Sequence, residues 1–119
     1  KLNLLEKKFI DIDIFRKARG STCGINYNNE IWFILHYTQI IDTTRKGNYL
    51  HFFVIFDENM NFKRYSEIFK FENFLVEYCL GFIIEEKRTI ISYSYNDCIS
   101  KIAIFDNYYI NNILNWYIN

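Results

Sequence analysis

The sequence has no excess of charge of either sign. Lysine and arginine together number 14, and aspartate and glutamate together also number 14. A chain without net charge has no long-range field that would attract nucleic acid or an anionic membrane. We therefore expect no nucleic-acid partner, and any ligand must be held by a local site.

The sequence also lacks a long apolar run. Crossing a bilayer as a helix takes roughly 20 consecutive apolar residues, and His36, Gln39 and Glu77 interrupt the best candidates. Residues 1–13, KLNLLEKKFIDID, lack the continuous apolar core of a signal peptide. These absences predict no membrane span and a cytoplasmic location.

Cysteine is scarce and proline is absent. Cys23, Cys79 and Cys98 are odd in number, and their spacing fits no zinc motif. This favours reduced, buried thiols in a cytosol-like compartment over a disulfide framework. His36, His51 and Glu77 are suitable zinc ligands by type but have no recognised spacing, so the sequence predicts neither a metal site nor a cofactor.

Hydrophobic residues make up 50% of the 119 residues and aromatic residues 20%. A chain of this length can bury one core but is too short for two ordinary domains. We therefore expect one domain or part of one. It comprises a preceding strand or connector (residues 1–18), one unit at residues 19–71 and a second at residues 72–119.

The stretch 74–97 reads as a hairpin. β-Branched pairs at 83–84 and 90–91 flank a charged turn at 85–88. Because antiparallel pairing places the start of one strand beside the end of the next, Glu77 should lie beside residues 94–97.

Two units of four antiparallel strands account for most of the chain. Alternation of Ile10, Ile12 and Ile14 with aspartates adds a half-exposed strand before them, and residues 28–29 suit a two-residue turn. The charges within residues 62–69 indicate an edge strand, and a polar loop is expected at 43–48. The predicted strands are residues 22–27, 31–39, 49–56 and 62–69, then 75–84, 88–95, 99–105 and 109–114.

The two units repeat each other at a period near 50 residues, because residues 54–57 recur as residues 103–106. Four strands per unit, with middle strands apolar on both faces, are typical of β-propeller blades, so we predict an all-β chain with two blades of an incomplete propeller. An eight-stranded β-sandwich is the alternative.

Short motifs occur in a fixed order along the chain. They are Arg19-Gly20-Ser21-Thr22, Tyr49-Leu50-His51-Phe52, Ile55-Phe56-Asp57, residues 66–71, Val76-Glu77-Tyr78-Cys79-Leu80-Gly81 and Ile91-Ser92-Tyr93-Ser94-Tyr95-Asn96-Asp97. This combination resembles the last two blades of the five-bladed propeller of furanosidase-type glycosidases and mannoside phosphorylases, in the divergent branch often attached to glycosyltransferases. The resemblance implies a carbohydrate-active module that acts on or binds glycans, either a divergent glycosidase-like enzyme or part of one. Phe52 stands where an arginine is common, which argues against phosphorolysis.

Antiparallel pairing independently gathers polar side chains at one end of both units. Glu77 and Asp97 are the candidate catalytic carboxyl groups, since glycoside cleavage needs two. Desolvation of Glu77 would suit a general acid, although an ion pair with Arg19 is an alternative role. The candidate substrate-binding residues are Arg19, Ser21, His36, Tyr49, His51, Ser94 and Tyr95.

Two other classes of function remain open at this point. One is a non-catalytic sugar-binding or scaffolding module attached to a glycosyltransferase, with Tyr37, Tyr49, Tyr93 and Tyr95 stacking on sugars. The other is a purely structural β-domain. Two blades would leave broad apolar faces uncovered, so the remaining blades of a propeller, or self-association, are expected partners besides carbohydrate. The residues expected on those faces are Trp32, Phe33, Phe52, Phe53 and Phe56.

Overall fold

The computed structural model describes residues 2–40 and 47–118. Most of these residues lie in β-strands, which confirms the predicted all-β class. The strands are β1 (Arg19–Gly20), β2 (Ile25–Tyr27), β3 (Glu30–Ile40), β4 (Gly47–Asp57), β5 (Phe62–Ser66), β6 (Glu77–Ile84), β7 (Arg88–Tyr95), β8 (Ile99–Asp106) and β9 (Trp116–Tyr117). The helices are α1 (Asp13–Lys17) and α2 (Asn107–Asn112).

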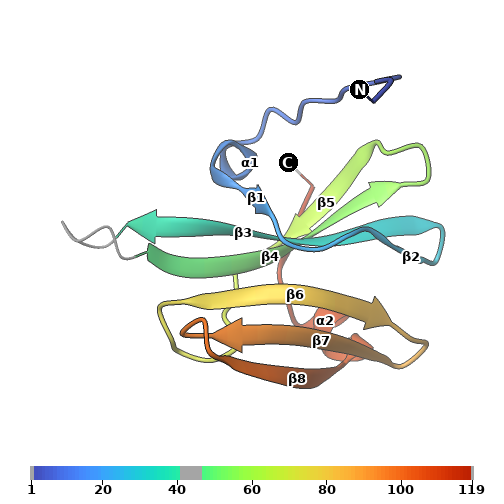
Figure 1. The fold of residues 1–119 in the computed structure, drawn as a ribbon. Helices are drawn as coiled ribbons and strands as arrows, with labels where there is room; N and C mark the ends of the chain where they lie inside the picture. Colours follow the sequence, from blue (N-terminus) through green and yellow to red (C-terminus); the bar gives the residue numbers. More distant parts are fainter. Residues whose placement is uncertain (1, 41–46, 119) are drawn as a thin grey trace.

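The strands form two antiparallel sheets that lie one above the other (Figure 1). Within the described residues, the first sheet has six strands in the order β1-β3-β4-β5-β9, with β2 also paired to β3. The second sheet has three strands in the order β6-β7-β8. The predicted positions of β3 and β7 as second strands are confirmed, whereas the prediction of two four-stranded sheets is wrong.

The core lies between the two sheets. Trp32 and Ile34 of β3 lie opposite Ile55 and Phe53 of β4, and these side chains are buried against β6 and β7. The second sheet contributes Cys79, Phe82 and Ile91. Burial of such side chains is the main favourable term in folding.

The other face of the first sheet is covered by the N-terminal part of the chain. The ring of Phe15 in α1 lies 5.9 Å from that of Phe52 and 5.6 Å from that of Phe62. The prediction that Trp32, Phe52 and Phe53 lie on an open face is wrong, because the second sheet covers Trp32 and Phe53 and α1 packs against Phe52. The other two residues of this prediction, Phe33 and Phe56, are half-buried.

The strand predicted from the isoleucine alternation near residue 12 is replaced by the one-turn helix α1. No strand of the described chain pairs with residues 10–14, so these residues have no neighbouring strand to stabilise an extended conformation. Arg16 and Lys17 in the last turn complement the negative end of the helix.

The strand predicted at residues 109–114 is also wrong, because helix α2 occupies this place. The Asp106 carboxylate caps the helix by accepting the Tyr108 N–H at 2.7 Å. Asn107 is buried, accepts the Thr89 hydroxyl at 2.6 Å and donates to the Glu85 carbonyl at 2.6 Å. These bonds start a helix where the β-propensity of residues 108–110 favours a strand.

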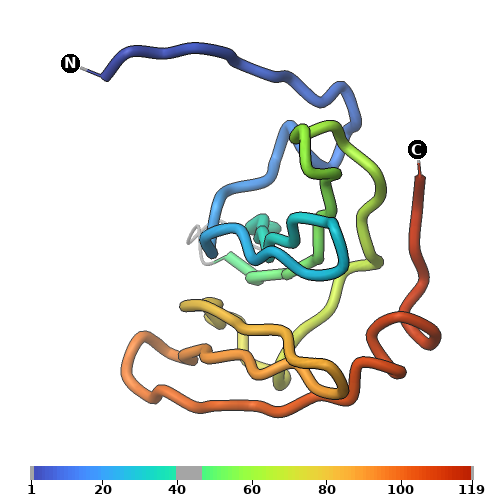
Figure 2. Tube along the Cα trace, turned by 90° about the vertical axis from the view of Figure 1, so that its right-hand side faces the viewer, coloured from blue at the N-terminus to red at the C-terminus, as the bar shows by residue number. Residues whose placement is uncertain are grey.

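The chain then returns to the first sheet, where β9 pairs with β5 (Figure 2). The predicted outer edge at β5 is therefore wrong, since β5 lies between β4 and β9. Trp116 explains the return: its ring lies 5.7 Å from that of Trp32, and the Arg64 guanidinium lies 5.2 Å over it. Arg64 is in turn held by both carboxylate oxygens of Glu30, at 2.8 and 3.1 Å.

The predicted turn at residues 28–29 is confirmed, because Asn28 and Asn29 have φ of 50° and 59°, as a two-residue hairpin turn requires. The predicted loop 43–48 lies outside the described residues at 43–46, and Gly47 already begins β4. Among the described residues, no helix has the length and apolar character needed to cross a membrane.

The Trp116→Ala variant tests the return of the chain. Removing an aromatic ring packed between the sheets should lower the free energy of unfolding by about 3 kcal/mol. Equilibrium urea denaturation measures this, with Ile118→Ala as a control that should change stability by less than about 0.5 kcal/mol because Ile118 is exposed. Equal effects of the two substitutions would contradict the described packing of β9.

Candidate functional site

Two histidines face each other at one end of the inter-sheet layer. His36 of β3 and His51 of β4 are directly opposite in the register, and both are buried. The Ser21 hydroxyl lies 2.5 Å from His36 Nδ1, and the Tyr49 ring stacks on the imidazole of His36 with ring centres 5.6 Å apart. Four of the predicted binding residues therefore meet in one cluster.

The two imidazoles are held in their neutral form. Burial lowers the pKa of His36, and the nearby positive charge of Arg19 lowers it further. Burial lowers the pKa of His51 to about 3, with smaller contributions from His36 and Lys70. His51 Nε2 accepts the Cys79 backbone N–H at 3.3 Å, which requires a neutral ring.

Arg19 is exposed in β1, opposite His36 in the register. A nucleophilic serine needs a histidine base that a third group orients. Ser21 and His36 supply the first two parts, and within the described residues no carboxylate hydrogen-bonds to His36. The cluster is therefore a positioned polar group of Ser–His–Tyr character without the third member of a hydrolytic triad.

Glu77 lies inside the protein, with an exposed fraction of 0%. Its Oε2 accepts the Glu72 backbone N–H at 2.7 Å, and its Oε1 lies 3.5 Å from Lys70 Nζ. The predicted neighbourhood of Glu77 and Tyr95 is confirmed, because the two residues pair across β6 and β7. No ion pair joins Arg19 to Glu77 in the described chain, and Lys70 is the cation that sequence reasoning missed.

Tyr78 points the other way from Glu77, as alternation along a strand requires. Tyr78, Ser94 and Ser100 lie side by side across β6, β7 and β8. They line a shallow groove together with Leu80, Asp97 and Cys98. The ring centre of Tyr78 also lies 5.3 Å from that of His36, so this tyrosine connects the groove to the histidine cluster.

The candidate residues therefore separate into two groups. Asp97 is exposed in the turn after β7, where it has φ of 53°, and it lines the groove with Ser94. Glu77 instead lies in the buried group, together with His36 and His51. The two carboxyl groups predicted to act as a pair do not face a common space, because Glu77 is fully buried inside the protein and Asp97 is exposed at the groove.

Most of the tyrosines considered for sugar stacking already stack on other rings. The Tyr95 ring lies 4.3 Å from Phe74 and nearly parallel to it, with Lys101 Nζ 4.9 Å from its centre. The Tyr93 ring stacks on Phe71 at 4.5 Å. Sequence reasoning missed Tyr78, although the alternation of buried and exposed positions around Glu77 was a signal that could have identified it.

No cluster of three or more histidine, cysteine or acidic side chains suited to a metal ion exists among residues 2–40 and 47–118. No protein-family model matches the chain, and comparisons with curated proteins and with solved structures find no match either.

The depressed pKa of His51 makes stability depend on pH. Because the unfolded histidine titrates near 6.5 and the folded one near 3, the unfolded chain binds more protons between these values. Stability from this group is therefore full above pH 6.5 and is lost as the pH falls. We expect the free energy of unfolding to drop by about 2 kcal/mol from about pH 7.5 to about pH 5 on account of His51.

Denaturant titrations at both pH values measure this drop. In the His51→Gln variant, the drop in the free energy of unfolding between these pH values should shrink by the His51 contribution. In His36→Gln it should shrink by less, because only the His51 pKa is displaced as far as 3. An unchanged pH dependence in His51→Gln would rule out His51 as the responsible group.

The three thiols should differ in reactivity. Burial raises the pKa of Cys79 to about 12, whereas Cys23 and Cys98 are exposed. A water-soluble maleimide should label two cysteines in native buffer and all three in denaturant, as read by mass spectrometry. The Cys79→Ala variant should take two labels under both conditions. Rapid labelling of a third thiol in native wild-type protein would contradict the described packing of β6.

Proposed function

We propose that this chain is a carbohydrate-binding module that holds a glycan without cleaving it. The observation that supports it best is the groove of Tyr78, Ser94, Asp97 and Ser100 on the outer face of the second sheet. Sugar-binding sites combine an apolar surface with a few convergent polar groups that fix orientation. The groove has both.

The groove residues have complementary chemical roles. The Tyr78 ring offers an apolar face to the C–H side of a pyranose, and its hydroxyl group adds a polar end. Ser94 and Ser100 can each donate and accept a hydrogen bond, and the Asp97 carboxylate accepts from vicinal hydroxyl groups. The His36 ring packs edge-on against the Tyr78 ring, with ring centres 5.3 Å apart.

Binding without cleavage follows from the placement of the carboxyl groups. Hydrolysis requires two carboxyl groups roughly 5–9.5 Å apart on either side of the glycosidic bond. Glu77 is enclosed and already engaged by Lys70 and the Glu72 N–H, which leaves Asp97 as the one exposed member of the predicted pair. This favours the non-catalytic alternative over a glycosidase.

The propeller identity and an attached glycosyltransferase belong to the same proposal. They are supported by the order of the motifs between residues 19 and 97 and by two stacked antiparallel sheets whose second strands are β3 and β7. In that setting the module would present a glycan to an enzyme supplied elsewhere. Three free cysteines suit a reducing compartment, as proposed from the sequence.

Titration of the protein with neutral oligosaccharides, β-mannosides and β-glucosides among them, tests the proposal by NMR or calorimetry. Tyr78→Ala should weaken binding about tenfold, since loss of an aromatic contact worth about 1.4 kcal/mol changes affinity by this factor. Tyr108→Ala removes an exposed tyrosine of α2 and should leave binding unchanged.

The Glu77→Gln variant separates binding from catalysis. Binding should persist in this variant, and wild-type protein should release no sugar from the same oligosaccharides. Product that appears with wild type and disappears with Glu77→Gln would support the glycosidase alternative. Equal affinity of wild type and Tyr78→Ala would contradict the groove as the site.

A further inference from the structure

Strand β8 is a sheet edge without a partner. It pairs with β7 on one side, and within the described chain its backbone makes no hydrogen bond on the other. An edge of this kind offers a row of free N–H and C=O groups to any extended segment that can reach it.

The other sheet edges are short or interrupted by a bulge, and β8 is neither. The first sheet ends in strands of two or three residues, β1, β2 and β9, and β6 carries a bulge between Cys79 and Gly81. β8 runs for eight residues with no shift in register. Its lysine, Lys101, is held by Glu72 at 2.9 Å. Short length and bulges are among the usual protections of an edge strand, and β8 has neither.

The outer face of β8 is apolar as well. The side chains of Ile102 and Ile104 are 72% and 61% exposed and alternate along one face of the strand. Leu80 and Ile83 of β6 lie on the same sheet and are also exposed. Exposed apolar patches of this kind mark interaction surfaces.

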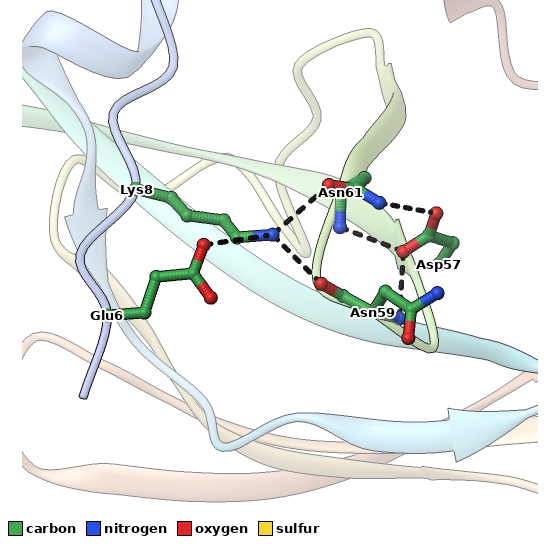
Figure 3. A network of polar contacts seen from close by, with 5 residues as sticks. All are labelled: Glu6, Lys8, Asp57, Asn59 and Asn61. Carbon is green, nitrogen blue, oxygen red and sulfur yellow. Dashed lines mark hydrogen bonds and ion pairs between the residues drawn. The ribbon is translucent and has the colours of Figure 1, made fainter.

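The same chain carries an exposed apolar segment that pairs with no strand of the described residues. Residues 2–7, here called the N-terminal arm, form no strand or helix, and Leu2 and Leu5 are 95% and 91% exposed. The arm is fastened at its base: Lys8 Nζ donates to the Asn59 carbonyl at 2.9 Å and to Asn61 Oδ1 at 3.1 Å (Figure 3). Beyond Lys8 the arm projects away from the sheets (Figure 1).

The arm and the β8 edge lie on opposite sides of the molecule. In both Figure 1 and Figure 2 the arm runs above the first sheet, whereas β8 forms the far side of the second sheet. Because the first sheet and β6–β7 separate them, the arm cannot pair with β8 of its own chain. A second copy of the chain, however, brings an arm with the required chemistry.

We propose that the N-terminal arm of one copy adds as a fourth strand to the β8 edge of another copy. An added strand places alternate side chains on each face. Leu2 and Leu4 then lie beside Ile102 and Ile104, and the arm backbone satisfies the free groups of β8. Because donor and acceptor are different surfaces, the contact is head-to-tail and gives rings or open chains of copies. The inference does not depend on glycan binding.

Two variants separate the halves of the contact. The arm variant Leu2→Ser/Leu4→Ser loses the apolar side chains of the donor but keeps its β8. The edge variant Ile102→Lys places a charge on the exposed acceptor face but keeps its arm. Sedimentation velocity over a concentration series measures the mass of the wild type, of each variant and of their equimolar mixture.

We expect the average mass of the sedimenting species to rise with concentration for wild-type protein. Each variant alone should associate at least tenfold more weakly. The decisive sample is the mixture. The arm of the edge variant fits the intact β8 of the arm variant, so the two should form a 1:1 complex of twice the 14.6 kDa chain mass. No third copy should add, because the remaining arm and the remaining β8 edge of this complex are the altered ones.

Two controls test whether the association is non-specific. Ile83→Lys places the same charge on the same face but on β6, two strands from β8, and should associate like wild type. Ile118→Ser removes another exposed apolar side chain and should also have no effect. A wild-type chain that stays monomeric, a mixture that forms no 1:1 complex, or equal loss of association in Ile83→Lys would each overturn the proposal. The last result would indicate packing of sheet faces instead.

Discussion

The packing of one sheet on the other is the constraint on which the rest of the structure depends. Trp32 and Phe53 are buried between β3–β4 and β6–β7, and neither sheet alone could cover them. Trp116 adds a third ring to the same layer, which draws the end of the chain back to β5. A small domain with a single core depends strongly on such a layer, because its net stability is a small difference between large terms.

The same layer changes from apolar to polar along its length. At one end it is filled by aromatic and aliphatic side chains. At the other it encloses His36, His51 and Glu77, whose burial is partly offset by Ser21, the Cys79 N–H and Lys70. Burial lowers the pKa of both histidines and keeps them neutral. The groove that we propose for glycans borders this polar end at Tyr78, whose ring contacts His36.

The three-stranded second sheet gives the molecule its two unsatisfied surfaces. Helix α2 takes the place of a fourth strand, so no strand of residues 2–40 and 47–118 pairs with the outer side of β8. The groove that we propose for glycans and the edge that we propose for the arm both lie on this sheet, the groove toward the Asp97 turn and the edge along β8. Ser100 belongs to both, so a bound arm would border the glycan groove.

The sequence by itself determined the local structure. The apolar runs of β3 and β4, the hairpin of β6 and β7, the turn at Asn28–Asn29 and the meeting of Glu77 with Tyr95 all follow from short-range pattern and antiparallel pairing. Only the tertiary structure decided what each face meets. Pattern cannot show that Asn107 bonds to Thr89 and turns the next residues into a helix, or that Lys70 reaches Glu77, because these contacts join residues distant in sequence or in different elements. Whether a strand edge is paired and whether a carboxyl group is buried depend on such distant contacts, and so does the separation of the candidate site into a buried cluster and an open groove.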